Sequence, residues 1–597
     1  MVHRPRGHES RHLRWEVKLL QDSPDGVWLP HEAWTPSSED ALARPDEDGV
    51  SDVVFLPFSH MSTLSTYEKK FQERAKKLPF RNFLMTMASW LPMNLYNRWS
   101  LITIYPESSR IGNLIRAEEY ENHTDEIQEQ RKVYDFSKSF FENYRELFLS
   151  VPLMALRQFP PIENSQYTEI SGWWVKNSYL SFWPCMDVEN ICYSFEVKEN
   201  CRDIFAGVMV WDNCENVYQS NSIIRSANIY YSRFILWSHD IWFSSNLIWC
   251  HDCLFCHDLE NSAYSINNTA YEEEEYLKEK EKILANKDLF EGWYATKVSG
   301  KGNNLVSTNV TGVYTTNSKD VQSGYYSYNI TQGKNVILTG SKDGNRNMYN
   351  VIASWAPHLD DCYNVINSGW WDTIYSSDII ARGSHIYYSY MLQGCSFCIG
   401  CIGLKNMSYC ILNKQYTKEE WEVLAEKIFG TMEADGSLGS FFPASMCPFY
   451  FNDTLAYLID DSFTKEEVEA EGYLWRDEPI RADIPEGMQV VKNTELGKYE
   501  GFRKSSLRKE LSEWNEDWGL VSEDSETPIP LSLRDTPLSQ GGLGTWHIDP
   551  EVMKVVISDE KWNYYRIVQM EYDFLMKHGL PLPRMHWLNR MKMGFQI

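Results

Sequence analysis

Two short runs in this chain of 597 residues place cysteines at the spacing of metal ligands. Each run is a doubled Cys-x2-Cys, a spacing that can wrap a zinc ion or an iron–sulfur cluster on a turn. If a metal is bound there, zinc is the cofactor that we consider first. The candidate metal ligands are Cys250, Cys253, Cys256, His257, Cys395, Cys398 and Cys401.

The same cysteines are in phase with a repeated phrase, which favours a structural role. Cys253 and Cys395 stand where other copies have Ile or Val, and Cys256 and Cys398 stand where others have Ser. A buried cysteine packs as a small hydrophobe. On a strand, residues three apart point to opposite faces, so the sulfurs of one run are not expected to converge. We predict a ladder of inert thiols and no cofactor, with bound metal or disulfides between copies as the alternatives.

The repeated phrase starts with Asn or Asp, continues with a small apolar residue and an aromatic-rich stretch, and often ends on Ser. Such a short period is typical of stacked units that cannot bury their apolar faces alone. Alternating apolar residues predict strands, and Asn or Asp suits the turns. The intervals between the starts are 13, 13, 13, 12, 12 and 12, and the starts are Asn177, Asn190, Asp203, Asn216, Asn228, Asp240 and Asp252.

The fold class that we predict is mainly β: a parallel β-solenoid, or β-helix, with a 12–13-residue phrase, flanked by helical caps and small α+β terminal segments. The phrase is either one small coil or half of a coil of about 25 residues. We favour the larger coil, because so many large aromatic side chains need interior volume. A second block of phrases at 335–410 is expected to continue the first in one stack.

The sequence divides into five regions. A helix is expected at 67–81, and apolar residues at spacings of three and four within 117–150 predict helix packed on the start of the solenoid. Capping boxes begin at Thr417 and Thr464, the first opening a helix suited to cover the open end, and a last helix should run from about 561 to Gly579. The regions are 1–75, a polar segment with a linker; 76–160, a ribbon-like and helical lead-in; 161–412, the solenoid, interrupted by a helical insertion at 270–300; 413–480, a helical cap; and 481–597, an extended segment with a C-terminal helix and ribbon remnant.

Several motifs follow one another in a suggestive order. Tyr134-Asp135-Phe136-Ser137-Lys138-Ser139-Phe140-Phe141-Glu142 comes first, the block Asn413-Lys414-Gln415-Tyr416-Thr417-Lys418-Glu419-Glu420 follows, and Leu580-Pro581-Leu582-Pro583-Arg584-Met585-His586 stands near the end. Over roughly residues 80–597 the chain resembles an uncharacterised family of Cys-rich proteins common in candidate-phyla bacteria. The resemblance implies a repeat body flanked by zinc ribbons and no established activity. Segments 80–130 and 584–590 contain no cysteine, so here packing must replace zinc.

Composition narrows the functional classes. Lys and Arg number 57 and Asp and Glu 83, giving a net charge of −26, which disfavours nucleic-acid binding. No apolar run reaches the length of about 18 residues that indicates a membrane-spanning helix, so none is expected. The N-terminus lacks the apolar stretch of a secretion signal, and the 13 cysteines are too sparse for a disulfide framework. We therefore predict a cytoplasmic protein.

The leading prediction of function is a non-catalytic scaffold or interaction protein of unknown process. Its repeat surface, or the charged helix expected at 271–290, would bind a protein partner. No phosphate-binding loop, zinc-protease motif or nucleophile elbow is present, so we assign no catalytic residue and lean away from an enzyme. Fold alone does not define more than this.

Two alternatives stay open. The first is a carbohydrate-active β-helix enzyme, a lyase or glycoside hydrolase, using paired carboxylates; its candidates are Asp360, Asp361, Asp372, Asp378 and Arg382. The second is a nucleic-acid-associated protein acting through a basic C-terminal end made of Arg566, Lys577, Arg584, Arg590 and Lys592. Tryptophans could stack on bases, but few Lys or Arg lie near them, so core packing is favoured for Trp173, Trp174, Trp211, Trp237, Trp242, Trp249, Trp355, Trp370 and Trp371.

Overall fold

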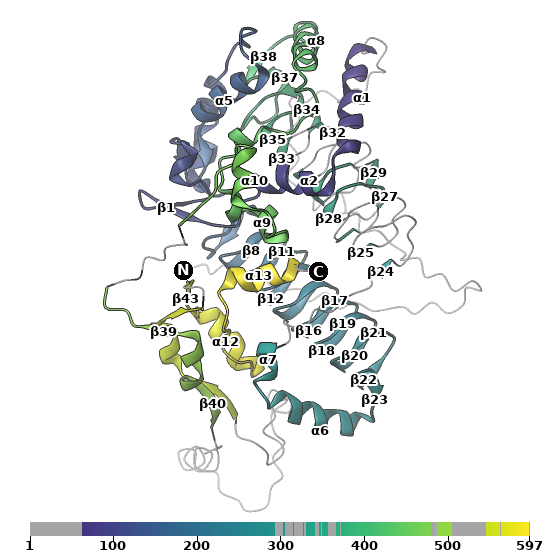
Figure 1. The fold of residues 1–597 in the computed structure, drawn as a ribbon, viewed down its shortest axis with the longest axis vertical. Helices are drawn as coiled ribbons and strands as arrows, with labels where there is room; N and C mark the ends of the chain where they lie inside the picture. Colours follow the sequence, from purple (N-terminus) through teal and green to yellow (C-terminus); the bar gives the residue numbers. More distant parts are fainter. Residues whose placement is uncertain are drawn as a thin grey trace, which may run out of the picture. The chain divides into compact units, whose positions relative to one another are not determined.

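Parallel strands stacked in regular coils form the body of the protein (Figure 1). A computed structural model describes residues 62–292, 383–478, 484, 486–503, 545–560 and 563–595, with shorter stretches between 303 and 381. The chain divides into residues 1–60 and 61–597, and all that follows concerns the second unit. The linker predicted within 1–75 lies outside the described residues, as do residues 504–544 of the extended segment predicted to begin at 481.

The first stack spans residues 158–270 and consists of two parallel sheets. Ile191 pairs with Ile204, and Ile229 pairs with Ile241, so the numbering advances by 13 or by 12 from one strand of a sheet to the next. One sheet contains β6 (Ile162–Glu163), β8 (Val175–Tyr179), β10 (Val188–Cys192), β12 (Arg202–Phe205), β14 (Glu215–Tyr218), β16 (Ala227–Tyr230), β18 (His239–Trp242), β20 (His251–Leu254) and β22 (Ala263–Ile266). The other contains β5 (Gln158–Phe159), β7 (Ser171–Gly172), β9 (Phe182–Cys185), β11 (Phe195–Lys198), β13 (Val208–Trp211), β15 (Asn221–Ile224), β17 (Arg233–Leu236), β19 (Ser245–Ile248) and β21 (His257–Glu260).

The β-solenoid prediction is confirmed, but one coil corresponds to a single phrase, so the preferred larger coil made of two phrases is wrong. Every third residue has left-handed backbone: φ is 57° at Asn228, 50° at Tyr231, 53° at Phe234 and 49° at Trp237. Each makes a corner, and four sides of three residues close one coil, which we call a rung. Left-handed backbone is costly for residues other than glycine, so the stacking contacts must outweigh this strain at every corner.

The shortening of the repeat by one residue partway along the stack has a local cause at one corner. In the longer rungs two consecutive residues have positive φ there, such as Asp212 and Asn213. In the next rung the corner is Arg225 alone, followed by Trp237 and Trp249. One residue is removed from one corner, and the other three sides keep their register.

The residue after each corner points into the coil, which explains why the phrase ends on Ser. Ile229, Ser232, Ile235 and Ser238 are all buried. The amide of Ser244 donates to the hydroxyl of Ser232 at 3.1 Å, and that hydroxyl donates to the carbonyl of Tyr230 at 2.8 Å. Buried serines thus provide hydrogen bonds for inward-facing amides along the stack.

The Asn and Asp residues that start each phrase form a ladder along another corner. Asn177 donates to Asn190 at 3.1 Å, Asn190 donates to Asp203 at 2.8 Å, and Asn228 donates to Asp240 at 3.1 Å. These residues tolerate left-handed backbone better than most, and their side chains bond across rungs. The turn role predicted for them is confirmed.

The large aromatic side chains lie outside the coil, contrary to the reason given for a larger one. Phe205 stacks on Phe574 at 4.3 Å, and Phe195 packs on Phe595 at 5.1 Å. The interior holds small residues such as Ile241 and Cys253. The aromatic rings therefore bind the C-terminal helices to the outer faces of the rungs.

A second stack spans residues 303–415. In the described strands none of its sheets pairs with a strand of the first stack, so the single continuous stack is wrong. One sheet contains β24 (Asn303–Asn304), β25 (Tyr314–Thr315), β26 (Tyr326–Ser327), β28 (Ile337–Gly340), β30 (Ile352–Trp355), β31 (Asn367–Gly369), β33 (Asp378–Ala381) and β35 (Tyr390–Gln393). The other contains β32 (Asp372–Tyr375), β34 (Ser384–Tyr387), β36 (Ser396–Ile399), β37 (Ser408–Ile411) and β38 (Lys414–Gln415), and β27 (Ile330–Gln332) pairs with β29 (Asn345–Asn347).

Both stacks end in the same way. The last parallel strand pairs with a short antiparallel one, β22 with β23 (Thr269–Ala270) and β37 with β38, and a helix follows. Asn268 donates to the carbonyl of His257 and accepts from its amide, both at 2.8 Å. Asn413 bonds Ile402 in the same way, at 2.9 and 2.8 Å. These asparagines satisfy backbone groups on the terminal rungs.

The helical insertion predicted at 270–300 is present as α6 (Glu273–Leu284) and α7 (Leu289–Gly292), and it ends the first stack. Tyr276 on α6 is fully buried and packs on Tyr264 of the last rung. Phe290 on α7 packs on Phe243 at 5.1 Å. The insertion therefore covers its own stack.

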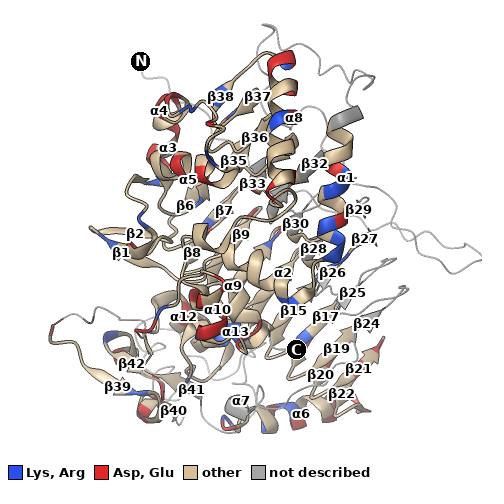
Figure 2. Cartoon of the chain, turned by 45° about the horizontal axis from the view of Figure 1, so that its top comes forward, with Lys and Arg blue, Asp and Glu red and all other residues tan. Residues whose placement is uncertain are grey.

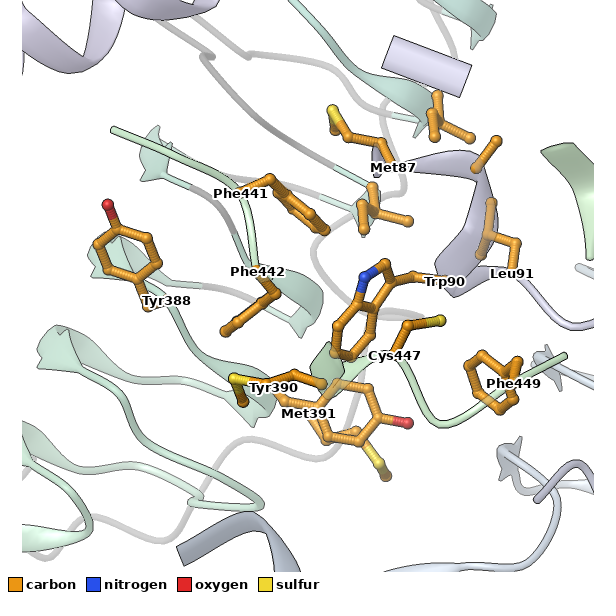
Figure 3. Packing of buried hydrophobic residues seen from close by; sticks show 14 of the residues in the cluster. Met87, Trp90, Leu91, Tyr388, Tyr390, Met391, Phe441, Phe442, Cys447 and Phe449 are labelled. Atoms are coloured by element: carbon orange, nitrogen blue, oxygen red, sulfur yellow. The ribbon is translucent and has the colours of Figure 1, made fainter. Parts of the chain in front are cut away.

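Helices from both sides of the sequence cover the second stack. In α5 (Phe140–Ser150) Ser139 and Glu142 form a capping box that the sequence analysis did not predict, and Phe140 and Phe148 pack on Tyr388 and Tyr390. The lead-in therefore packs on the second stack rather than at the start of the solenoid. Figure 3 shows the adjoining cluster, where Trp90 lies 5.0 Å from Phe442. Neighbouring elements are α1 (Ser62–Lys77), α2 (Phe80–Thr86), β1 (Tyr96–Arg98), β2 (Leu101–Thr103), β3 (Leu114–Ile115), α3 (Ala117–Tyr120), α4 (Thr124–Glu129) and β4 (Leu153–Met154).

Helix α8 (Lys418–Ala434) begins at the predicted capping box of Thr417 and buries Trp421 and Ile428. Trp421 packs on Phe397 and Tyr409, and Phe429 packs on Tyr387 of an earlier rung. The helix therefore lies along the side of several rungs. The prediction that it covers the open end of the solenoid is wrong. At α10 (Lys465–Ala470) Thr464 caps the helix, and α9 (Leu455–Ile459) precedes it.

The C-terminal part is small and mixed. The last predicted helix is α12 (Gln569–His578), which begins later than expected and ends at Gly579 with φ 63° as predicted. A further helix, α13 (Trp587–Phe595), was missed. The strands are β39 (Val490–Lys492), β40 (Glu500–Arg503), β41 (Thr545–Ile548), β42 (Val556–Ser558) and β43 (Tyr564–Tyr565). Within the described ranges, no helix combines the length and apolar character needed to cross a bilayer.

Candidate functional site

The two cysteine runs line the interior near the end of each stack. Each cysteine follows a left-handed corner, such as Asp252 before Cys253 and Phe397 before Cys398. Because every third residue points inward, Cys250, Cys253 and Cys256 all lie inside one rung. The expectation that residues three apart diverge is therefore wrong, since it assumed an uninterrupted strand.

The register corrects part of the assignment of cysteines to the phrase. Cys253 pairs with Ile241, and the Cys256 amide donates to the Ser244 hydroxyl, as predicted. In the second run Cys398 pairs with Ile386, so it occupies an Ile position and not a Ser position. Cys401 is the residue that replaces Ser, because its amide donates to Ser389 at 3.0 Å.

The chemistry of these thiols is that of a buried core. All twelve described cysteines are buried and unpaired by disulfides. Hydrogen bonds with Cys250 and Cys256, together with burial, hold the pKa of Cys253 well above its ordinary value, while the bond with Cys253 lowers the pKa of Cys250 to about 7. Hydrogen bonds with three neighbouring thiols and burial raise the pKa of Cys398 likewise. The central cysteine of each run therefore favours the neutral thiol, whereas a zinc ligand must be a thiolate.

His257 lies apart from the sulfurs of its run. Its Nδ1 is 2.8 Å from the Ser245 hydroxyl on the preceding rung, on an outer face. Burial lowers the pKa of its imidazole. In the part of the chain that the structure describes, no three of the predicted ligands have ligand atoms within 4.8 Å of one another. Metal binding by the cysteine runs stays a prediction.

The sequence reasoning missed a group of ligand atoms on the surface. His239, Asp240 and Asp252 place three ligand atoms within 4.8 Å of one another. His239 Nδ1 lies 2.9 Å from Asp240, and Lys280 lies 3.6 Å from Asp252. A neighbouring ammonium competes with a cation for this carboxylate. The signal in the sequence was the repeated His-Asp pair, at 239–240 and 251–252.

Two stacked ring pairs lie on the same two rungs as this group. Trp237 and Trp249 stack with centroids 5.2 Å apart, and His239 and His251 stack at 5.0 Å. Trp249 is 52% exposed. We call these four residues with Asp240 and Asp252 the Trp–His patch. Rung spacing fixes the rings at the repeat of a parallel sheet, about 4.8 Å, so the patch is rigid.

The carboxylates of the carbohydrate-enzyme alternative do not form a described pair. Asp378 is 1% exposed and bonds Arg157 at 3.3 Å, and Arg157 also pairs with Glu169. Its side chain is committed to a buried network. Asp360, Asp361 and Arg382 lie outside the described residues, as does the side chain of Asp372.

Four of the five basic side chains at the C-terminal end are paired with acids within the chain. Arg590 pairs with Glu571 in a buried ion pair, and Arg584 pairs with Glu500. Lys592 lies 2.6 Å from Asp461, Lys577 lies 3.9 Å from Asp203, and Arg566 donates to the carbonyl of Met553. Such pairing leaves little positive charge for phosphates, so this observation does not support nucleic-acid binding.

A cavity of about 650 Å³ lies where the insertion meets the C-terminal part. Its walls include Tyr231 of the first stack, Phe290 of α7, Gly501 of β40 and Trp546 of β41. Lys287 projects its amine here and donates to the carbonyl of Gly579 at 2.7 Å. Since the wall residues come from distant parts of the sequence, no local pattern could have predicted the cavity.

Lys287 is enclosed by aromatic rings. Its Nζ lies 5.0 Å from the centroids of Phe290 and Trp546 and 6.0 Å from that of Phe502. Burial lowers the pKa of Lys287 to about 8, against the opposing effect of the Glu500 carboxylate. A larger fraction of this amine than of an ordinary lysine is therefore neutral near neutral pH.

Comparisons with known protein families, with curated proteins and with solved structures gave no match for this chain.

Proposed function

We propose that this β-solenoid protein is a non-catalytic scaffold that binds a protein partner through the Trp–His patch. The observation that carries the proposal is the stacked pair of Trp237, half-buried, and Trp249, exposed, on the same two rungs as the stacked pair of His239 and His251. Rigid aromatic rings lose little conformational entropy on binding, and Trp is enriched among residues that dominate interface energies. Figure 2 shows that the strands carry few charges, whereas helices such as α10 carry acidic residues.

Charge defines the kind of partner. The chain has a net charge of −26, and Asp240 and Asp252 lie within the patch. An arginine of the partner could stack on Trp249 and pair with a carboxylate. We therefore expect a partner segment that presents Arg or Lys. A cytoplasmic location fits the free thiols of the twelve described cysteines.

The test uses a photo-crosslinking amino acid at His251 in cells of the organism that produces the protein. We expect one crosslinked partner with a basic contact surface, and Trp249→Ser should weaken its binding at least tenfold. The matched control is Trp99→Ser, since Trp99 is 71% exposed and lies far away in the sequence on the turn between β1 and β2. Crosslinks that persist in Trp249→Ser, or that fall equally in Trp99→Ser, would refute this use of the patch.

The resemblance to a Cys-rich bacterial family stays a prediction. If it holds, the flanking segments correspond to the zinc ribbons of the family and are held here by packing. The packing of Phe574 on Phe205 and of Phe140 on Tyr388 is consistent with this role.

A further inference from the structure

The cavity at Lys287 has the size and walls of a small-molecule site. At about 650 Å³ it falls within the size range of ligand-binding pockets, and its wall combines aromatic and aliphatic residues with charged ones. Tyr231, Phe290 and Trp546 provide flat apolar walls. The surroundings of this lysine are built from four separate segments, which fix its position more firmly than a surface side chain.

Protein groups satisfy only part of the hydrogen-bonding capacity of the Lys287 amine. An ammonium group has three donors, and the hydrogen bond that the structure gives Lys287 is the one to Gly579 at 2.7 Å. The rings of Phe290 and Trp546, with centroids 5.0 Å from Nζ, offer it no hydrogen-bond acceptor as strong as water. Such surroundings favour the neutral amine, the form that attacks carbonyl carbon.

We propose that this cavity binds a small carbonyl compound, with the amine of Lys287 forming a reversible imine with it. The lone pair of the neutral amine adds to the carbonyl carbon and gives a carbinolamine. Loss of one water then breaks the C–O bond and forms the C=N bond, with the two amine protons leaving in that water. No oxidant or reductant is needed, and hydrolysis reverses the step.

The charges at the cavity define the ligand class. Arg584 and Lys592 are each paired with an acid, Glu500 and Asp461 respectively. The acids in the wall outnumber the cations, because they are Asp288, Asp461, Glu500, Asp559 and Glu560 against Lys287, Arg584 and Lys592. A neutral or cationic carbonyl compound with a flat apolar body fits these walls better than an anionic one.

The experiment treats the full-length protein with benzaldehyde, its para-carboxylate and its para-trimethylammonium derivative, each with cyanoborohydride to trap the imine. Peptide mapping then locates the adducts. We expect Lys287 to be modified at least ten times faster than the exposed Lys282 and Lys554, and the carboxylate to react most slowly. The rate at Lys287 should rise as pH increases through about 8. Equal rates at the three lysines would overturn the proposal, and no dependence on ligand charge would overturn the ligand class.

A cavity-filling variant separates a ligand site from a merely reactive amine. Gly501 lines the cavity, and a Cβ added there meets no atom within 4 Å, so Gly501→Trp should fill the space with the fold retained. We expect at least tenfold slower labelling of Lys287 in this variant. Gly112→Trp is the control, because Gly112 has equal room outside the cavity. Unchanged labelling in Gly501→Trp would overturn the cavity as the site, and the wild-type comparison of lysines stands even if this variant fails to fold.

Discussion

Replacing Ser232 with alanine should lower the free energy of unfolding by about 1–3 kcal/mol. The Ser232 hydroxyl is fully buried, donates to the Tyr230 carbonyl at 2.8 Å and accepts from the Ser244 amide at 3.1 Å. Alanine leaves that amide inside the coil without its acceptor. The desolvation penalty of an unsatisfied buried donor therefore sets the magnitude, because little packing volume is lost.

Two further variants test whether the hydrogen bond is the cause. Cys256 occupies the same ladder position two rungs on, and its thiol donates to Leu254 at 3.4 Å. Ser232→Cys should therefore cost about 1 kcal/mol or less, since sulfur is a weaker partner of similar geometry. Ser262→Ala is the control, because its exposed hydroxyl donates to the carbonyl of Glu260 at 3.2 Å, and the loss of this bond should cost below about 0.5 kcal/mol.

Urea unfolding followed by circular dichroism gives the stabilities. Hydrogen exchange measured by mass spectrometry on a peptide covering 240–250 reports the Ser244 amide itself. The second measurement is needed because repeat arrays can unfold in more than one step. Ser232→Ala within about 0.5 kcal/mol of the wild type, or equal costs for Ser232→Ala and Ser262→Ala, would refute the reasoning.

Three other predictions concern buried charges and thiols. Glu571→Leu should destabilise the protein by about 3–5 kcal/mol because it leaves Arg590 buried without its carboxylate, and adding Arg590→Met should restore most of that loss in thermal melts; an equally unstable double variant would contradict this. Burial lowers the pKa of His578 and His586 to about 4, so the unfolded chain binds more protons between about pH 6.5 and 4, and stability should fall as pH falls through that window; a flat profile of urea midpoints would contradict it. Ellman's reagent should react slowly with the native protein and reveal 13 thiols after denaturation, whereas near-stoichiometric zinc or iron in elemental analysis would restore the metal-ligand prediction for the cysteine runs.

The repeat could be predicted from the sequence because a ladder needs the same residue at the same place in every rung. Asn and Asp at the start of each phrase bond one another across rungs, as Asn228 bonds Asp240 at 3.1 Å. The spacing of these residues gave the parallel β-solenoid. The shape of the coil could not be predicted from the two-residue alternation of apolar side chains that is typical of strands. In the coil the period is three residues, because Trp237, Asp240 and Phe243 are left-handed corners that interrupt the strands.

The predicted coil size was wrong because hydrophobicity alone does not show whether a buried residue lies inside the coil or on its outer face. Tyr218 and Phe205 are buried, yet they are buried by Phe574, which belongs to a segment near the C-terminus. An analysis of the local sequence places these rings inside the coil and therefore predicts a coil that is too large. Isoleucine, serine and cysteine at every third position were the better measure of the interior.

The end of each stack was readable from the sequence in a way that we overlooked. Cys250, Tyr264 and Asn268 recur at Cys395, Tyr409 and Asn413, always at the same offset in the numbering. The structure gives both asparagines the same pair of backbone hydrogen bonds on the terminal rung. One chain thus contains two stacks with equivalent ends. The Cys-x2-Cys runs belong to that equivalence, which explains their similarity without requiring a metal.

The Lys287 cavity shows why this amine could not be singled out from the sequence. In the sequence Lys287 follows a run of lysines and glutamates and has the appearance of one more solvated charge. Its amine becomes nucleophilic only because Phe290, Trp546 and Gly579 surround it, and these residues come from the insertion and from the distant C-terminal part. Desolvation is a property of the tertiary structure, so the sequence can show which residues are able to act as nucleophiles, whereas packing decides which of them does.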